Sequence, residues 1–191
     1  MEKIGLFFGS FNPIHVGHLI IANYMVSNTD LKKVWLVVSP QNPLKQKNTL
    51  ANDYDRLHLA RLAVEDNLLL QVSDIEFSLP KPSYTIDTLT YLKEKYPTKE
   101  FVLIMGGDNV GTLHKWKNYE QLLENYEVYV YKRPNYELGE LATHHKIKFF
   151  EAPMLDISAT YIRDAIRNKK SIQYLVSEKV FDYLESSKMY K

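Results

Sequence analysis

The chain has 191 residues, and 45% of them are hydrophobic and 25% charged, which is ordinary for one globular domain. Twenty-four Lys and Arg residues against 23 Asp and Glu residues give a formal charge of +1, which argues against a nucleic acid or an anionic membrane as partner. Cysteine is absent, so disulfides, thiolate metal sites and a thiol nucleophile are excluded.

The chain begins with a short apolar run that Gly and Pro interrupt, in MEKIGLFFGSFNPIHVGH, which does not resemble a secretory signal. No later stretch approaches the roughly 20 apolar residues that cross a bilayer. We therefore expect a soluble, cytoplasmic protein.

Six short runs rich in β-branched and aromatic residues are predicted to be buried strands: Lys3–Phe8, Val34–Ser39, Leu68–Val72, Phe101–Met105, Glu127–Tyr131 and Ile147–Phe150. Between the first five runs lie segments with the residue spacing of a helix, at Val16–Val26, Asp53–Val64, Tyr84–Lys95 and Tyr119–Glu124. This alternation predicts an α/β fold with a Rossmann-like, doubly wound and mainly parallel sheet. Two C-terminal helices, one from Ser158 through Arg167 and one at Glu178–Glu185, are expected to pack on the same sheet, so that residues 1–191 form a single domain.

Polar residues mark the expected helix starts, namely Asn52 or Asp53, Ser83, Ser158 and Ser177. Four segments are predicted to be loops: Pro40–Ala51, Ile75–Ser83, Gly106–Asn118 and Lys132–Lys146. Because open α/β sheets bind ligands beyond the carboxyl ends of their strands, these loops are expected to carry the binding groups.

The most informative segment is GSFNPIHVGH, residues 9–18, between the first predicted strand and the first helix. A glycine permits a sharp turn there, and the N–H groups and dipole of the helix start attract an anion. His15 and His18 are three residues apart, so on a helix both project from one face and could hold one triphosphate. Simple capping of backbone groups by each histidine is the less favoured reading, and a zinc site lacks a third ligand.

A second anion site is predicted at ISATYIR, residues 157–163. The helix start offers backbone donors, the hydroxyls of Ser158 and Thr160 add more, and the Arg163 guanidinium can fork onto phosphate oxygens. Taken alone, this string fits a common serine cap followed by an arginine equally well.

Together the two segments resemble the nucleotidyltransferase superfamily, whose signatures are G-x-F-x-P-x-H-x-G-H and I-S-x-T-x-I-R. Three further segments resemble the bacterial nicotinate-nucleotide adenylyltransferases, namely PSYTIDTL at 82–89, GGD at 106–108 and KWKNYEQLL at 115–123. The resemblance runs from Ile4 to Tyr190.

The resemblance implies transfer of AMP from ATP to nicotinate mononucleotide, with ATP and this acceptor as partners and Mg²⁺ arriving with ATP. The implied ATP-binding residues are Gly9, Ser10, Phe11, His15, His18, Gly106, Asp108, Arg133, Ile157, Ser158 and Arg163, of which His15, His18 and Arg163 are catalytic. The implied acceptor-binding residues are Lys45, Ser83, Tyr84, Thr85, Trp116 and Lys117. The pyridine ring would stack on Trp116, and backbone N–H groups at Thr85 and near Lys117 would receive its carboxylate. No protein cage for a metal is implied, and a homo-oligomer stays open.

Two of these contacts rest on weaker matches. Where the family often has N-x-x-P-P-H-K, this chain has PQNPLK at 40–45, so Lys45 is either a phosphate contact or a solvated lysine. Arg133 matches the family's K-R-P turn and reads equally well as a surface residue. Three other histidines, His58, His144 and His145, are expected to be solvated.

Two alternative functions stay open. One is a related adenylyltransferase that uses nicotinamide mononucleotide or phosphopantetheine, and the other is a non-catalytic nucleotide-binding module on the same fold. A role in charging tRNA, where His-x-Gly-His also occurs, is disfavoured because 191 residues leave no room for an anticodon-binding domain and the charge gives no RNA surface.

Overall fold

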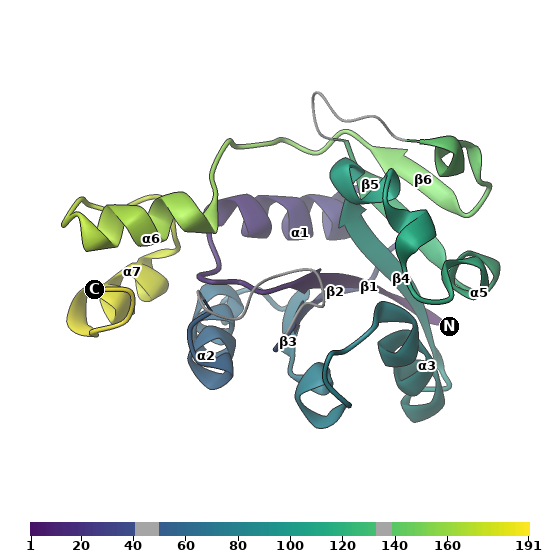
Figure 1. The fold of residues 1–191 in the computed structure, drawn as a ribbon, viewed down its shortest axis with the longest axis horizontal. Helices are drawn as coiled ribbons and strands as arrows, with labels where there is room; N and C mark the ends of the chain where they lie inside the picture. Colours follow the sequence, from purple (N-terminus) through teal and green to yellow (C-terminus); the bar gives the residue numbers. More distant parts are fainter. Residues whose placement is uncertain (41–49, 133–138) are drawn as a thin grey trace.

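A sheet of six parallel strands organises the computed structural model, which describes residues 1–40, 50–132 and 139–191 (Figure 1). The strands are β1 (Glu2–Gly9), β2 (Lys33–Val38), β3 (Leu70–Ser73), β4 (Lys99–Gly106), β5 (Glu127–Tyr131) and β6 (Ile147–Phe150). Their order is β3-β2-β1-β4-β5-β6, and every neighbouring pair is parallel. The predicted doubly wound α/β fold is confirmed, and the sheet expected to be mainly parallel is parallel throughout the described chain.

The main helices are α1 (Val16–Asn28), α2 (Asp53–Val64), α3 (Thr85–Lys95), α5 (Tyr119–Asn125), α6 (Ala159–Arg167) and α7 (Glu178–Ser186). Three segments predicted to be loops also contain short helical turns, namely η2 (Ile75–Ser78), α4 (Gly107–Val110), η3 (Leu113–Lys115) and η4 (Glu140–Thr143). The sequence did not reveal them because three or four residues are too few to show a helical period. Among the described residues, none of the helices combines the length and apolar character that crossing a membrane requires.

Helices cover both faces of the sheet, and the strand residues alternate between two hydrophobic clusters. One cluster joins α1, α2, α6 and α7 to strand residues such as Leu36 and Ile104. The other joins α3 and α5 to residues such as Val37 and Leu103. Figure 1 shows α1 and α3 on opposite sides of the strands. Burial on both faces explains why the strands read as continuous apolar runs. The C-terminal helices, expected on the sheet, join one of these clusters from the end of the sheet, where α7 packs against α2.

Some element boundaries differ from those predicted. The third strand begins at Leu70 rather than Leu68, whose side chain is 86% exposed. Asn52 caps α2, because its Oδ1 accepts the Tyr54 N–H at 2.9 Å. The expected cap Ser83 is not the cap of α3, because that helix begins one residue later, after Tyr84.

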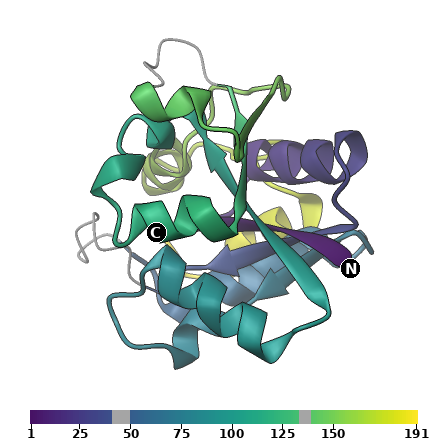
Figure 2. The same cartoon turned by 90° about the vertical axis from the view of Figure 1, so that its right-hand side faces the viewer.

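A network of ion pairs closes the amino edge of the sheet, the side from which Figure 2 views the molecule. Lys3 Nζ, on β1, lies 2.8 Å from the Asp30 carboxylate and 2.9 Å from that of Glu127. The Glu100 carboxylate is 3.6 Å away. Partial burial disfavours the charged form of Lys3, but the hydrogen bonds to Asp30 and Glu127 outweigh it and raise the pKa of the ammonium. This network ties β1, β4 and β5 together at the edge opposite their carboxyl ends.

We expect Lys3→Met to destabilise the fold by roughly 3 kcal/mol, because it leaves three carboxylates facing one another around an 83% buried position without their cation. Urea unfolding at neutral pH measures the change. The matched control is Lys132→Met. Lys132 pairs on the surface with Glu151, 2.9 Å away, and loss of this pair should cost less than about 1 kcal/mol. Equal costs for the two variants would show that the Lys3 network contributes no more than a surface pair.

Candidate active site

The carboxyl ends of β1 and β4 lie side by side and supply two of the predicted segments. The strands pair in parallel register, with Phe7 opposite Ile104, and they end at Gly9 and Gly106. In a doubly wound sheet the adjacent ends of strands 1 and 4 form the crevice in which ligands bind. The topology therefore brings the turn after β1 and the GGD segment to one place.

The turn after β1 is tightly packed. Phe11 is buried and has a φ of 44°, a left-handed conformation that costs a non-glycine residue about 1 kcal/mol. Its ring lies against Gly9, where an added Cβ would approach the ring carbons to 2.7 Å. The turn thus needs a glycine at the end of β1 for the aromatic ring to fold back.

The two histidines stack on each other at the start of α1. Their ring centroids are 3.7 Å apart with an interplanar angle of 28°. The backbone N–H of His15, the N-cap residue, donates to Nδ1 of His18 at 3.2 Å. Because Nδ1 of His18 is an acceptor, the proton of its neutral ring is on Nε2. The shared face predicted from the spacing is confirmed, and His18 holds an N–H donor on the ring nitrogen away from the backbone.

Gly17 leaves room for this stack. A Cβ at this position would lie 3.0 Å from Nδ1 of His15, closer than such atoms normally approach. The edge of Phe11 supports the other imidazole, with ring centroids of Phe11 and His18 5.1 Å apart at 85°. The glycine between the histidines is therefore a packing requirement of the pair.

Arg163 joins α6 to the same turn across 151 positions of the chain. Its Nη1 donates to the Asn12 carbonyl at 2.7 Å, and its Nη2 donates to Thr160 Oγ1 at 3.2 Å. Ser158 caps α6 as predicted, because its Oγ accepts the Tyr161 N–H at 3.1 Å. Nε of Arg163 is buried and makes no hydrogen bond with the part of the chain that the structure describes. A guanidinium and the start of α6 therefore lie at the histidine turn.

Arg56 was not predicted to belong to the site, although it organises the strand ends. Its side chain is completely buried. Nη1 donates to the carbonyls of Ser10, just after β1, and Ser39, just after β2. Nε donates to the Ala51 carbonyl at 3.1 Å, and Nη2 pairs with the Asp53 carboxylate at 2.8 Å.

A sequence signal for Arg56 did exist. It lies three and four positions before Leu59 and Ala60, which face the core, so it falls on the apolar stripe of its own helix. A charged residue on that stripe needs buried partners. Those partners come from the two strand ends, which helical spacing alone cannot identify.

Gly106 and Asp108 follow β4 closely. Gly106 is the N-cap of α4, and Asp108 lies in the first turn of this short helix. An added Cβ on Gly106 would approach Asp108 Oδ1 to 2.3 Å and the Tyr131 ring to 3.0 Å. The glycine thus allows the Asp108 carboxylate to fold back over the end of β4, beside the turn that carries the histidines.

A second unpredicted residue, Glu76 in η2, holds the segment predicted to bind the acceptor. Its side chain is 2% exposed. The hydroxyls of Ser83 and Thr88 each donate to it at 2.9 Å, and the side chain of Ser39 also hydrogen-bonds to it. Burial raises the pKa of this carboxyl, against the opposing effect of the three hydroxyls. The hydroxyl of Ser83, predicted to contact the acceptor, is therefore engaged by Glu76.

The other described residues predicted to bind the acceptor gather at the start of α3. Thr85 is its first residue and Tyr84 its N-cap. Lys117 bridges to this helix, with Nζ 2.7 Å from the Asp87 carboxylate and 4.8 Å from the centroid of the Tyr84 ring. The neighbouring Trp116 is half-buried, and its Nε1 has no hydrogen-bond partner among the described residues. The two predicted acceptor segments are thus brought together through Lys117.

Three other predicted site residues contribute little to the description of the site. Lys45 and Arg133 lie outside the described residues. Ile157 is half-buried and packs against the core cluster that α6 joins, so its side chain supports the serine cap.

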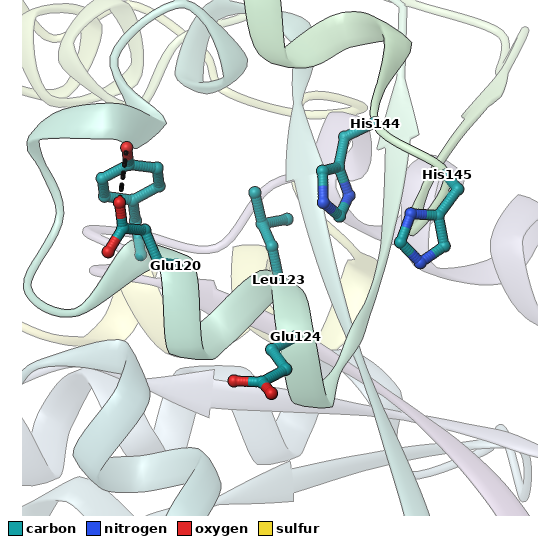
Figure 3. Close-up of a pocket in the computed structure, with 6 residues that line it drawn as sticks. Glu120, Leu123, Glu124, His144 and His145 are labelled. Atoms are coloured by element: carbon teal, nitrogen blue, oxygen red, sulfur yellow. Dashed lines mark hydrogen bonds between the residues drawn. The ribbon is translucent and has the colours of Figure 1, made fainter.

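A separate cavity of about 390 Å³ lies between α5 and the segment before β6 (Figure 3). It is lined by Tyr119, Glu120, Leu123, Glu124, His144 and His145. His145 is exposed as predicted, whereas His144 is half-buried, and burial and the neighbouring His145 lower its pKa. Across the described ranges no three His, Asp or Glu side chains converge as metal ligands would. This cavity shares no residue with the histidine turn.

The chain matches a known protein family and several named relatives. A family model described as cytidylyltransferase-like matches residues 6–165. A protein of Flavobacterium psychrophilum named "Probable nicotinate-nucleotide adenylyltransferase" is 56% identical over 191 residues, with 99% of each chain covered. A protein of the same name from Bacteroides thetaiotaomicron is 41% identical and covers 95% of this chain and 90% of its own.

Solved structures share the fold. The nicotinic acid mononucleotide adenylyltransferase of Plasmodium falciparum, solved in complex with NaAD, aligns with a TM-score of 0.83 at 20% identity, covering 100% of this chain and 98% of its own. A protein of Vibrio parahaemolyticus named "Putative Nicotinate-nucleotide Adenylyltransferase" aligns with a TM-score of 0.75 at 23% identity, covering 97% of this chain and 100% of its own.

We expect the raised pKa of Glu76 to make the fold lose stability as pH rises. The folded chain keeps this proton above the ordinary carboxyl pKa of 4.5, so its stabilising contribution is complete below pH 4.5 and is lost as pH passes through the folded-state pKa. Residue 76 of Glu76→Gln cannot titrate, so the free energy of unfolding of this variant should rise relative to that of the wild type across that pH window. Urea unfolding of both proteins between pH 4.5 and 7.5 measures the difference, with Glu185→Gln, an exposed carboxyl on α7, as control. A pH-independent difference would contradict this prediction.

Proposed function

The chain belongs to the cytidylyltransferase-like family and, within it, to the nicotinate-nucleotide adenylyltransferases, and we propose from this premise that it transfers the AMP part of ATP to nicotinate mononucleotide. The observation that carries the proposal is the convergence of the stacked pair His15 and His18 with Arg163 at the carboxyl end of β1. The Arg163 guanidinium, two helix starts and the imidazoles, which can offer N–H donors, form a local site for anions in a chain of nearly neutral net charge.

The reaction requires no covalent intermediate. An oxygen of the acceptor's 5′-phosphate attacks the α-phosphorus of ATP, a new P–O–P bond forms, and the bond to the β-phosphate breaks to release pyrophosphate. The attacking phosphate is already an anion near neutral pH, so a general base contributes little. Positioning of the two anions and neutralisation of charge on the leaving oxygens lower the barrier.

The geometry supports different roles for the two histidines. The Nε2–H of His18, whose position the His15 N–H fixes through Nδ1, serves the α-phosphate and the leaving oxygens. His15 and Arg163 serve the β- and γ-phosphates, and the carboxylate of Asp108 contacts nucleotide hydroxyls. Ser10, just after β1, and Ser158, the N-cap of α6, add donors to the triphosphate.

We propose that the nicotinate ring lies against Trp116 and that its carboxylate is received at the start of α3. The first N–H groups of a helix have no intrahelical partner, and at α3 these belong to Thr85 and its neighbours. Lys117 contributes through its backbone, because its ammonium is paired with Asp87. Lys45 and Arg133 stay proposed phosphate contacts from the sequence alone.

Mg²⁺ would arrive with ATP, held by phosphate oxygens and water, and would neutralise part of the triphosphate charge. This ion needs few protein ligands, which fits the absence of a convergent acidic cluster among the described side chains. The chain's own part is to orient the triphosphate with the histidines and Arg163.

We expect His18→Ala to lower turnover by about 10² to 10³ while changing the KM for nicotinate mononucleotide little, because a donor to the leaving oxygens acts mainly in the transition state. His18→Asn should lose as much activity, because its side-chain oxygen can still accept the His15 N–H but it cannot reach the position of Nε2. The matched control His145→Ala, in the separate cavity, should retain full activity. Near-normal turnover by His18→Asn would limit His18 to a capping role.

We also expect pyrophosphate release from Mg-ATP to be at least tenfold more efficient with nicotinate mononucleotide than with nicotinamide mononucleotide, about 1.4 kcal/mol of discrimination. The physical reason is that an amide cannot give the start of α3 the charge that a carboxylate gives. Parallel assays with these two acceptors and phosphopantetheine measure kcat/KM. Equal rates would remove the carboxylate pocket but keep the enzyme class, and absence of release with every acceptor would favour a non-catalytic nucleotide-binding module.

A further inference from the structure

A tyrosine distant in sequence from the predicted site contacts the histidine turn. The hydroxyl of Tyr190 donates to Oδ1 of Asn12 at 2.8 Å, across 178 positions of the chain. Tyr190 follows α7, is half-buried and has a φ of 66°. Figure 1 shows α6 and α7 beside the end of the sheet from which the chain enters α1, so this contact reaches the turn from the side of the C-terminal helices.

Asn12 is a junction that receives donors from three parts of the chain. Its side-chain Oδ1 accepts the Tyr190 hydroxyl and also the Ala51 N–H, at 3.1 Å. Its main-chain carbonyl accepts Nη1 of Arg163 at 2.7 Å. Asn12 is only 5% exposed. Because the side chain is fixed by two donors, the carbonyl of the same residue is held in one direction.

The Tyr190 phenol is half-buried and lies near two guanidinium groups. The guanidinium groups of Arg56 and Arg163 both act on it electrostatically, and Asp55 acts in the opposite sense. Burial nevertheless raises the pKa of the phenol, so the hydroxyl keeps its proton and acts as a donor. A neutral donor can fix Asn12 there without withdrawing the positive charge of Arg163 from a phosphate.

We propose that Tyr190 is a positioning residue for the ATP half of the reaction, acting through Asn12 on Arg163. The proposal rests on the proposed function, because it assigns to Tyr190 the orientation of a guanidinium that serves the β- and γ-phosphates. Arg163 uses one Nη nitrogen on the Asn12 carbonyl and the other on Thr160. A shift of the Asn12 backbone, once its side chain loses the Tyr190 hydroxyl, would redirect the guanidinium and leave the start of α3, the proposed acceptor site, unchanged.

The first test is Tyr190→Phe, which removes the hydroxyl and keeps the ring. Loss of one hydrogen bond to a buried acceptor should reduce kcat roughly fivefold and raise the KM for ATP about threefold. The KM for nicotinate mononucleotide should stay unchanged. Tyr174→Phe removes a hydroxyl from a side chain that is 83% exposed and should leave all three constants as in the wild type.

A double-mutant cycle with Arg163→Met shows whether the effect passes through Arg163. If Tyr190 acts only by orienting this guanidinium, Tyr190→Phe should have no further effect on turnover in the Arg163→Met background. A full fivefold loss in that background would overturn the proposal. So would an unchanged kcat in the single variant, or a change confined to the KM for nicotinate mononucleotide.

Two further measurements separate this proposal from general destabilisation and from failure of the proposed function. Thermal unfolding of Tyr190→Phe should show it fully folded at the assay temperature, so that the kinetic constants refer to native protein. If the wild type releases no pyrophosphate with any acceptor, the proposed function fails. Calorimetric titration with Mg-ATP then still tests Tyr190: about threefold weaker binding by Tyr190→Phe supports the proposal, and equal affinity overturns it.

Discussion

The buried guanidinium of Arg56 joins the ends of the two strands from which the site begins. It donates to the carbonyls that follow β1 and β2 and pairs with Asp53 on its own helix. Removing a charge from water costs several kcal/mol unless it is paired and hydrogen-bonded. Here the strand ends supply carbonyls that the sheet itself does not satisfy, and their hydrogen bonds offset the cost of burying the Arg56 charge. The same hydrogen bonds fix the direction in which the histidine turn leaves β1.

In the proposed reaction, binding of a triphosphate requires protein groups that are fixed in position. The net charge of +1 provides no general attraction for ATP, so the attraction has to come from groups that converge at one point. The turn achieves this with few charges, because a backbone group orients His18 and another orients Arg163. These groups are the His15 N–H and the Asn12 carbonyl. Groups oriented before the substrate arrives need little reorganisation during reaction, and this is the main source of electrostatic catalysis.

The sequence predicted the parts of the structure that local patterns determine. The strands and long helices follow from hydrophobic runs and spacing, and the histidine pair follows from its position between a strand and a helix. The sequence did not reveal three residues, because the role of each depends on a partner elsewhere in the chain. Arg56 bonds to Ser10, 46 positions away, and Glu76 bonds to Thr88, 12 positions away. Tyr190 bonds to Asn12, 178 positions away. The cap assigned to Ser83 failed for the same reason, since a buried carboxylate seven positions earlier binds its hydroxyl.

Ser39, at the end of β2, connects the two halves of the site. Its carbonyl accepts from Arg56, which holds the histidine turn, and its side chain hydrogen-bonds to Glu76, which holds the start of α3. In-line transfer requires two anionic substrates to be held with their reacting atoms about 3 to 3.5 Å apart. The histidine turn and the start of α3, which are the proposed ATP and acceptor sites, are both connected to Ser39 at a strand end. The sheet therefore sets the distance between them.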